Sequence, residues 1–258
     1  MTTDTFVLVA FAWLGLAVGS FLNVCIHRIP LGTSVASPPS RCPACSYQLR
    51  WFDNIPLLSW AILRGRCRKC GNPISIRYPI VELLTMAMFV GHWWMFGWTI
   101  LMVVRLVFAC ALIVLFAIDL EHHLLPNVIT LPGIVAGLIC SLIVPPGIVD
   151  AILGTLLGGG VLWAIGEAYY RYAGQEGMGG GDVKMLAMVG AFLGWKLVVV
   201  TLVLSSVAGS LIGLLVIALR RGDMKYALPY GTFLALGALA SSLFGDRIVA
   251  WYVGMYQF

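Results

Sequence analysis

Apolar runs long enough to cross a membrane recur through most of this 258-residue chain. A transmembrane helix needs about 20 predominantly apolar residues, because the hydrocarbon core of a bilayer is about 30 Å thick. Only 10% of the residues are charged, against about 25% in soluble domains. Strands of a membrane barrel would alternate apolar and polar residues instead. The sequence therefore predicts an all-α, polytopic membrane helix bundle.

We expect about eight transmembrane helices in this bundle. They are predicted near residues 5–26, 80–97, 100–118, 127–145, 148–169, 183–195, 197–219 and 228–245. No basic residue precedes the first run, so we expect that span to be retained rather than removed as a signal peptide. Glycines four residues apart predict close helix packing at Gly15/Gly19, Gly133/Gly137, Gly154/Gly158 and Gly209/Gly213.

Lysine and arginine residues are distributed unequally between the two sides of the predicted bundle. Residues 27–78 hold eight of the 16, and the loops and helix ends on the same side bring that number to thirteen. The opposite side keeps Lys196 and Arg247, while Arg105 lies inside a span. The positive-inside rule places the basic side in the cytoplasm and the N-terminus outside. The net charge of +5 thus reflects topology and contact with anionic lipid, not nucleic-acid binding.

Four cysteines form two CxxC pairs in the basic segment. Cys42 and Cys45 make the first pair, and Cys67 and Cys70 make the second pair after 21 intervening residues. Two such pairs offer four thiolates to one ion, which is the ligand set of structural zinc sites. Free thiols or a redox pair are the alternatives, but the cytoplasm disfavours disulfides. We expect a zinc-ribbon-like loop in which Zn2+ has a structural role only, because a four-cysteine site leaves no open position.

Two aspartates stand where an apolar chain should avoid charge. Asp119 ends the run that begins at residue 101, and Asp182 follows a glycine-rich string. Ionisable residues at such positions are costly and usually functional. Gly179, Gly180 and Gly181 allow close backbone approach, and we expect them to line a loop that takes an extended peptide.

A pair of neighbouring carboxylates can share one proton and perform acid–base chemistry on a peptide bond. The residues alone leave helix capping, ion binding and proton relay open for Asp119 and Asp182. The alternative functions are a transporter or channel that binds cations or protons through the carboxylates, and a non-catalytic scaffold based on the cysteine loop. A zinc protease is disfavoured, because His122 and His123 are adjacent and lack the HExxH spacing. Glu82 is expected either to cap the helix that follows the cysteine loop or to face the site, and capping is favoured.

Several motifs, taken together and in order, resemble the bacterial type IV prepilin peptidases. They are GSFLNV at residues 19–24 with Arg28 and Pro30, the two cysteine pairs, FDNIP at 52–56, Leu58 to Trp60, Arg77 to Pro79 with Glu82, Asp119 with Pro126 and Asn127, Gly179-x-Gly181-Asp182 with Lys184, and Pro229 to Gly231. The resemblance covers nearly the whole chain and implies a GxGD aspartic peptidase in which Asp119 and Asp182 are the catalytic pair.

The resemblance also implies the wider function. Prepilins of type IV pili or pseudopilins of type II secretion would be cleaved after a glycine at the cytoplasmic face of the bacterial inner membrane. The new N-terminal residue would then be N-methylated with S-adenosylmethionine. We expect the first transmembrane helix at residues 1–27, the cytoplasmic zinc loop at 28–78 and the peptidase core at 79–258. No residues for the methyl donor can be assigned, since no GxGxxG follows a strand.

Overall fold

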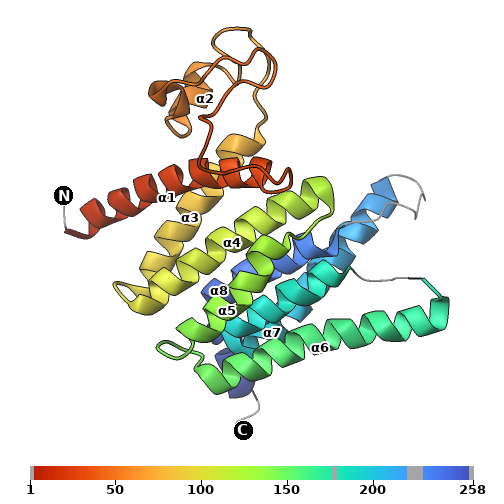
Figure 1. Ribbon diagram of the computed structural model, residues 1–258. Coiled ribbons are helices and arrows are strands. Elements are labelled where there is room, and N and C mark those ends of the chain that lie inside the picture. The colour runs from red at the N-terminus through yellow and green to blue at the C-terminus, as the bar shows by residue number, and fades with distance from the viewer. Residues whose placement is uncertain (1–2, 176–178, 220–228, 256–258) are drawn as a thin grey trace. The chain divides into compact units, whose positions relative to one another are not determined.

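A computed structural model describes residues 3–175, 179–219 and 229–255, and within these ranges its regular secondary structure is helical (Figure 1). Two isolated β-bridges are the sole extended pairings in the described part of the chain, which confirms the all-α prediction. The elements are α1 (Thr3–Arg28), the 3-10 helix η1 (Trp51–Asn54), α2 (Leu58–Ile62), α3 (Arg77–Phe96), α4 (Ile100–His122), α5 (Asn127–Cys140), α6 (Ile148–Ala173), α7 (Gly180–Leu219) and α8 (Tyr230–Gly254).

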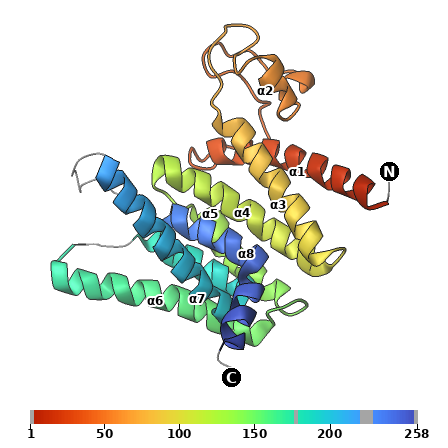
Figure 2. The same ribbon diagram turned by 180° about the vertical axis from the view of Figure 1, so that it is seen from behind.

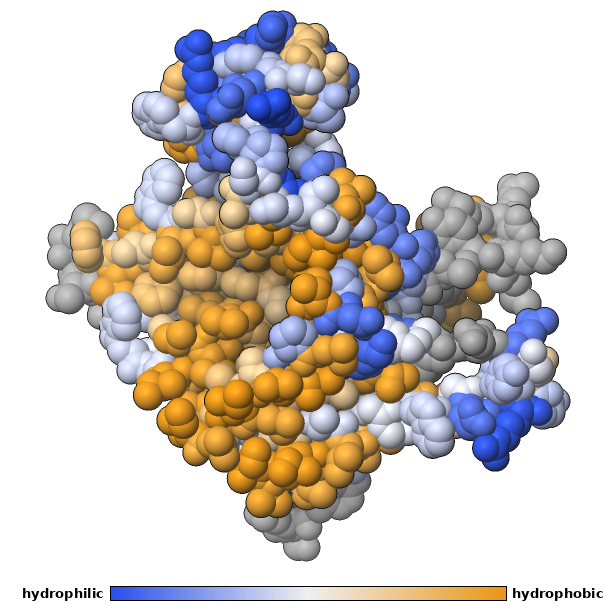
Figure 3. Space-filling model, viewed as in Figure 1, coloured by the Kyte–Doolittle hydropathy of each residue, from blue (hydrophilic) through white to orange (hydrophobic). Residues whose placement is uncertain are grey.

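Helices α1, α3, α4, α6, α7 and α8 are long and apolar enough to cross a membrane. Their outward surfaces are largely hydrophobic, whereas polar residues gather on the loop between α1 and α3 (Figure 3). Large exposed side chains such as Leu142, Leu156 and Leu214 would be unfavourable in water but suit contact with lipid. The protein is therefore a multi-pass membrane protein.

The chain divides into two compact units, and the first comprises Met1–Met102. In this unit α1 packs against α3 through glycines. A side chain at Gly15 would come within 2.7 Å of the Met86 Cα, and one at Gly19 equally close to the Glu82 Cα. Because only glycine permits this approach, the predicted packing face of the first helix is confirmed.

The second unit, Val103–Phe258, contains nearly all of α4 and helices α5 to α8. Gly154 lies against the backbone of Gly190 and Gly194, so α6 and α7 approach each other closely. Phe108 of α4 stacks on Phe192 of α7 with ring centroids 4.7 Å apart. The buried core of this unit consists mainly of aliphatic residues from α4 and α7.

Helix α7 is two antiparallel segments joined at Gly194, whose φ of 77° and ψ of 170° are not helical. Leu197 lies against Gly245 near the end of α8, and Gly209 lies against Phe233 near its start. Since Gly231 at the start of α8 also meets Asp182, residues 195–219 return to the end from which α7 began (Figures 1 and 2). The break at Gly194 separates the predicted spans 183–195 and 197–219.

Helix α5 is shorter than expected. The prediction of a span over 127–145 is wrong at its end, because the helix stops at Cys140 after 14 residues. The residues after Cys140 form turns, in which the Ser141 N–H donates to the Gly137 carbonyl at 2.9 Å, and Pro145 and Pro146 come after these turns. The Ser141 hydroxyl instead donates to the Ala191 carbonyl at 2.9 Å and ties the end of α5 to α7.

Candidate active site and four-cysteine loop

Asp119 lies in the last turns of α4, where its side chain is 5% exposed. The hydroxyl of Thr232, in the first turn of α8, donates to Asp119 Oδ2 at 3.0 Å. This contact joins residues 113 positions apart. Burial of a carboxyl group is costly unless it has a hydrogen-bond partner, and Thr232 provides that partner.

Asp182 lies in the first turn of α7. Helix α7 begins at Gly180, so Gly180 and Gly181 form its first turn and Gly179 precedes it. A side chain at Gly181 would come within 2.9 Å of Leu125 Cβ. Gly181 therefore permits a close approach of α7 to the segment before α5. Gly177 and Met178, which also belong to the glycine-rich string, lie outside the described residues.

The two aspartates meet at Gly231. A side chain at that glycine would come within 2.8 Å of Asp119 Oδ2 and 2.9 Å of Asp182 Oδ1. The two oxygens thus lie less than about 6 Å apart, because each is within 3 Å of the same point. One water molecule can bridge such a gap with hydrogen bonds of ordinary length. Helices α4, α7 and α8 therefore bring two residues 63 positions apart in the chain into one carboxylate pair.

The segment between α4 and α5 closes one side of this pair. Leu125, 7% exposed, also lies 2.8 Å from the position of a side chain at Gly231. Lys184, one turn into α7, donates to Asn127 Oδ1 at 2.9 Å. Lys184 is helical, so its side chain points to α5 and not along that of Asp182.

The histidines near Asp119 do not form a metal site. His122 and His123 are exposed, and His122 lies 3.9 Å from Glu121. Among the residues that the structure describes, the four cysteines are the one group of metal-binding side chains close enough to share an ion.

The two cysteine pairs adopt the same local fold. Cys42 N–H donates to the Tyr47 carbonyl at 2.9 Å, and Cys67 N–H donates to the Asn72 carbonyl at 2.8 Å. The residue after each second cysteine, Ser46 or Gly71, has a positive φ that turns the backbone. Each CxxC pair is thus a compact turn, and each is closed by one of the two β-bridges.

The four sulfur atoms fit a tetrahedral zinc ion. The Sγ atoms of Cys42, Cys45, Cys67 and Cys70 all lie within 4.8 Å of one another. Cys42 and Cys70 are 3.8 Å apart, and Cys45 and Cys67 are 4.0 Å apart. A zinc–sulfur bond of about 2.3 Å gives sulfur separations of about 3.8 Å in a tetrahedron. Backbone N–H groups of Cys70 and Lys69 lower the pKa of Cys67 to about 6, which favours the thiolate.

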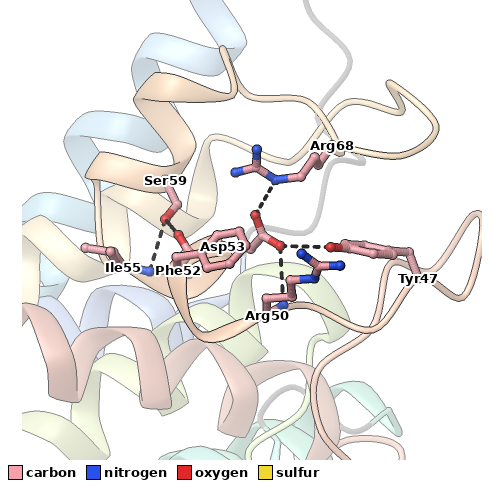
Figure 4. A network of polar contacts seen from close by, with 7 residues as sticks. All are labelled: Tyr47, Arg50, Phe52, Asp53, Ile55, Ser59 and Arg68. Carbon is pink, nitrogen blue, oxygen red and sulfur yellow. Dashed lines mark hydrogen bonds and ion pairs between the residues drawn. The ribbon is translucent and has the colours of Figure 1, made fainter.

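A buried acid organises the part of the loop between the cysteine pairs (Figure 4). Arg68 Nε donates to Asp53 Oδ1 at 2.7 Å. The Tyr47 hydroxyl and the Arg50 N–H each donate to Asp53 Oδ2 at 3.3 Å. Arg68 lies between the cysteines of the second pair, and Tyr47 follows those of the first. Asp53 therefore links the two pairs independently of metal.

Glu82 does not cap α3, so that expectation is wrong. The helix begins five residues earlier, and the Glu82 side chain is buried at 6% exposure. Its Oε2 accepts the N–H of Leu57 at 2.8 Å. Leu57 has a positive φ of 59°, which only a fixed partner would hold in place for a leucine. Glu82 thus anchors the cysteine loop to α3.

Sequence reasoning missed the role of Thr232 and of Leu125. A single threonine among apolar residues carries no signal of its own, since threonine often bonds within its own helix. Gly231 was noted as part of a motif, but its contact with both aspartates depends on how three helices pack. These residues become visible only when the ends of α4, α7 and α8 are brought together.

Comparison with known proteins agrees with these features. A family described as "Bacterial Peptidase A24 N-terminal domain" matches residues 13–96, and the "Type IV leader peptidase family" matches residues 106–214. No solved structure matches the chain.

Curated relatives carry the name prepilin leader peptidase/N-methyltransferase. One from Aeromonas hydrophila is 40% identical over 92% of this chain and 91% of its own length. One from Pseudomonas aeruginosa is 36% identical over 93% of this chain and 91% of its own. One from Myxococcus xanthus is 46% identical, and the match covers 79% of this chain and 61% of that relative's length. By these matches, the chain belongs to the type IV leader peptidase family.

Proposed function

We propose that this protein is a membrane aspartic endopeptidase that removes the leader from prepilins or pseudopilins and then N-methylates the new N-terminal residue. The observation that carries the peptidase part is the meeting of Asp119 Oδ2 and Asp182 Oδ1 at Gly231. The names of the curated relatives support both the substrate and the methylation.

In the proposed reaction, Asp119 and Asp182 share one proton, because two carboxylates this close do not both ionise easily. The ionised group takes a proton from a water molecule, whose oxygen bonds to the scissile carbonyl carbon. The protonated group gives its proton to the carbonyl oxygen. The carbon–nitrogen bond then breaks as the first proton moves to the amine, and the second proton returns to its carboxylate.

The proposed location is the bacterial inner membrane, with the N-terminus in the periplasm and the active site facing the cytoplasm. The asymmetry of lysine and arginine supports this orientation. Gly179, Gly180 and Gly181 would lie beside the bound peptide. We further propose the division into the first helix at residues 1–27, a cytoplasmic loop at 28–78 and the peptidase core at 79–258.

Zinc and the methyl donor have different support. Cys42, Cys45, Cys67 and Cys70 would hold a zinc ion that stabilises the loop and takes no part in either reaction. S-adenosylmethionine would supply the methyl group. The described ranges contain no strand that leads through a glycine turn into a helix, the usual nucleotide-binding arrangement, so we assign it no residues.

Purified protein mixed with a prepilin tests the peptidase. Asp119→Asn and Asp182→Asn should each lower cleavage by roughly 10²–10⁴-fold, which is the usual contribution of a proton-transfer residue. Asp150→Asn is the matched control, because Asp150 lies beside Gly194, far along α7 from Asp182. Full cleavage by both active-site variants would refute the carboxylate pair and favour a scaffold. If the wild type cleaves no prepilin but carries an ion flux in liposomes that the aspartate variants lose, the result would favour transport.

A further inference from the structure

The carboxylate pair is asymmetric. Asp119 Oδ2 accepts the hydroxyl of Thr232 at 3.0 Å. Among the described residues, no hydrogen bond to the Asp182 carboxylate is found. Its Oδ1 and Oδ2 lie 2.9 Å and 3.4 Å from the positions that side chains at Gly231 and Gly179 would occupy. Thr232 is itself 5% exposed, so water does not compete for its hydroxyl. A donor aimed at one carboxylate of a pair stabilises the ionised form of that carboxylate.

We infer that Thr232 is a positioning residue that makes Asp119 the base of the pair and leaves Asp182 as the proton donor. Asp119 would then take the proton from the attacking water, and Asp182 would protonate the carbonyl oxygen. This inference rests on the proposed peptidase function and adds the division of roles, which neither the motif nor the distance between the aspartates specifies.

Other titratable groups near Asp119 come from the helices packed around it. They are Asp182 on α7, His123 just after α4, and Tyr230 on α8 beside Asp182. Lys184 of α7 is held by Asn127 of α5. His123 is exposed and therefore screened by solvent. Thr232 is thus the buried hydrogen-bond donor that distinguishes Asp119 from Asp182.

The test is the pH profile of kcat/KM for Thr232→Val, which removes the hydroxyl and keeps the branched shape. The acidic limb reports the base, and the basic limb reports the acid. Loss of a hydrogen bond to a charged group should move the acidic limb upward by roughly one pH unit. Thr232→Ser should restore the wild-type profile.

Thr201→Val is the matched control. Thr201 is also buried, and its hydroxyl donates to Ser241 at 3.0 Å, away from the aspartates. Its pH profile should match that of the wild type even if the protein is less stable. A movement of the basic limb in Thr232→Val would assign Asp119 as the acid and overturn the inference. So would a uniform loss of activity with both limbs unchanged.

A second readout does not depend on substrate. Carbon-13 NMR of aspartate-labelled protein, with Asp119→Asn to assign the signal, follows titration of the Asp119 carboxyl directly. The Thr232→Val titration should lie about one pH unit above that of the wild type. Coincident titrations would overturn the inference. If the wild type cleaves no prepilin but the titrations differ, the proposed function fails while the link between Thr232 and Asp119 stands.

Discussion

Arg68, which lies between the two cysteines of the second pair, donates from its Nε to Oδ1 of Asp53 at 2.7 Å. Asp53 is almost fully buried, whereas the Arg68 side chain is 46% exposed. The guanidinium of Arg68 and that of Arg50 also lie over the Phe52 ring, at 5.2 Å and 5.8 Å from its centroid. One acid and one aromatic ring thus bring Arg50 and Arg68, two basic residues of the loop, together.

This ion pair predicts a pH-dependent loop. Burial alone would raise the pKa of Asp53, but hydrogen bonds from Arg68, the Arg50 N–H and Tyr47, with the charge of Arg68, hold it below its usual value. A lowered pKa stabilises the folded loop above the unfolded pKa of about 3.9, and this contribution is lost as the pH falls through the folded pKa. Asp53→Asn should cost about 1 kcal/mol at neutral pH, since solvent screens the exposed Arg68.

Hydrogen exchange of the loop in the wild type and in Asp53→Asn checks this prediction. The difference in loop hydrogen exchange between the two proteins should be largest above pH 5. It should vanish well below pH 4, because the reference pKa of aspartate is about 3.9. Comparison at each pH cancels the effect of acid on the cysteine thiolates. A constant difference across this range would show that Asp53 acts through its shape and not through its charge.

A side chain at Gly231 should disable the site. In Gly231→Ala, the added Cβ would lie 2.8 Å from Asp119 Oδ2 and from Leu125 Cδ1, so the carboxylates or α8 must move. Displacements of about 1 Å at reacting groups cost on the order of 100-fold in rate. Cleavage of a prepilin by Gly231→Ala should fall by at least that factor.

The matched control is Gly209→Ala, whose added Cβ would make ordinary contacts with Phe233 at 3.5 Å. It should retain wild-type cleavage. Near-normal activity of Gly231→Ala, together with unchanged thermal stability, would contradict the close meeting of the two aspartates.

Zinc removal should disturb the loop and leave the carboxylate pair unchanged. Elemental analysis of reduced protein should find one zinc per chain, and a chelator or Cys42→Ser should abolish it, because four thiolates complete the tetrahedron. Hydrogen exchange should then rise throughout residues 40–73 and stay unchanged at Asp119 and Asp182. Cys140→Ser, in α5, should keep its zinc. Absence of zinc from the reduced wild type would refute the metal site.

The sequence predicted some features well because they are local. Charge frequency and run length indicated the membrane helices, and CxxC spacing indicated the metal cluster, since each depends on residues close together in the chain. The pairing of Asp119 with Asp182 depends on three helix ends, and residue patterns could only suggest it. The length of α5 was mispredicted because residues 141–144 continue the apolar run although they form turns, and hydropathy alone does not distinguish the two. Glu82 was misread because its partner, Leu57, comes from a loop 25 residues earlier.

The reversal at Gly194 should be needed for the fold. Its φ of 77° with a ψ of 170° is a region that residues with a side chain rarely adopt, and its added Cβ would also lie 2.8 Å from Pro146 Cβ. Gly194→Ala should therefore destabilise the protein by about 1–3 kcal/mol, the cost of a strained backbone conformation. Thermal unfolding in detergent measures this loss.

The control is Gly160→Ala, whose added Cβ would meet no atom within 4 Å. It should be neutral or slightly stabilising, because alanine has a higher helix propensity than glycine. Equal stabilities of the two variants would mean that the chain does not reverse direction between residues 180–193 and 195–219. The reversal would then not explain how Asp182 and the start of α8 lie at the same end of the unit.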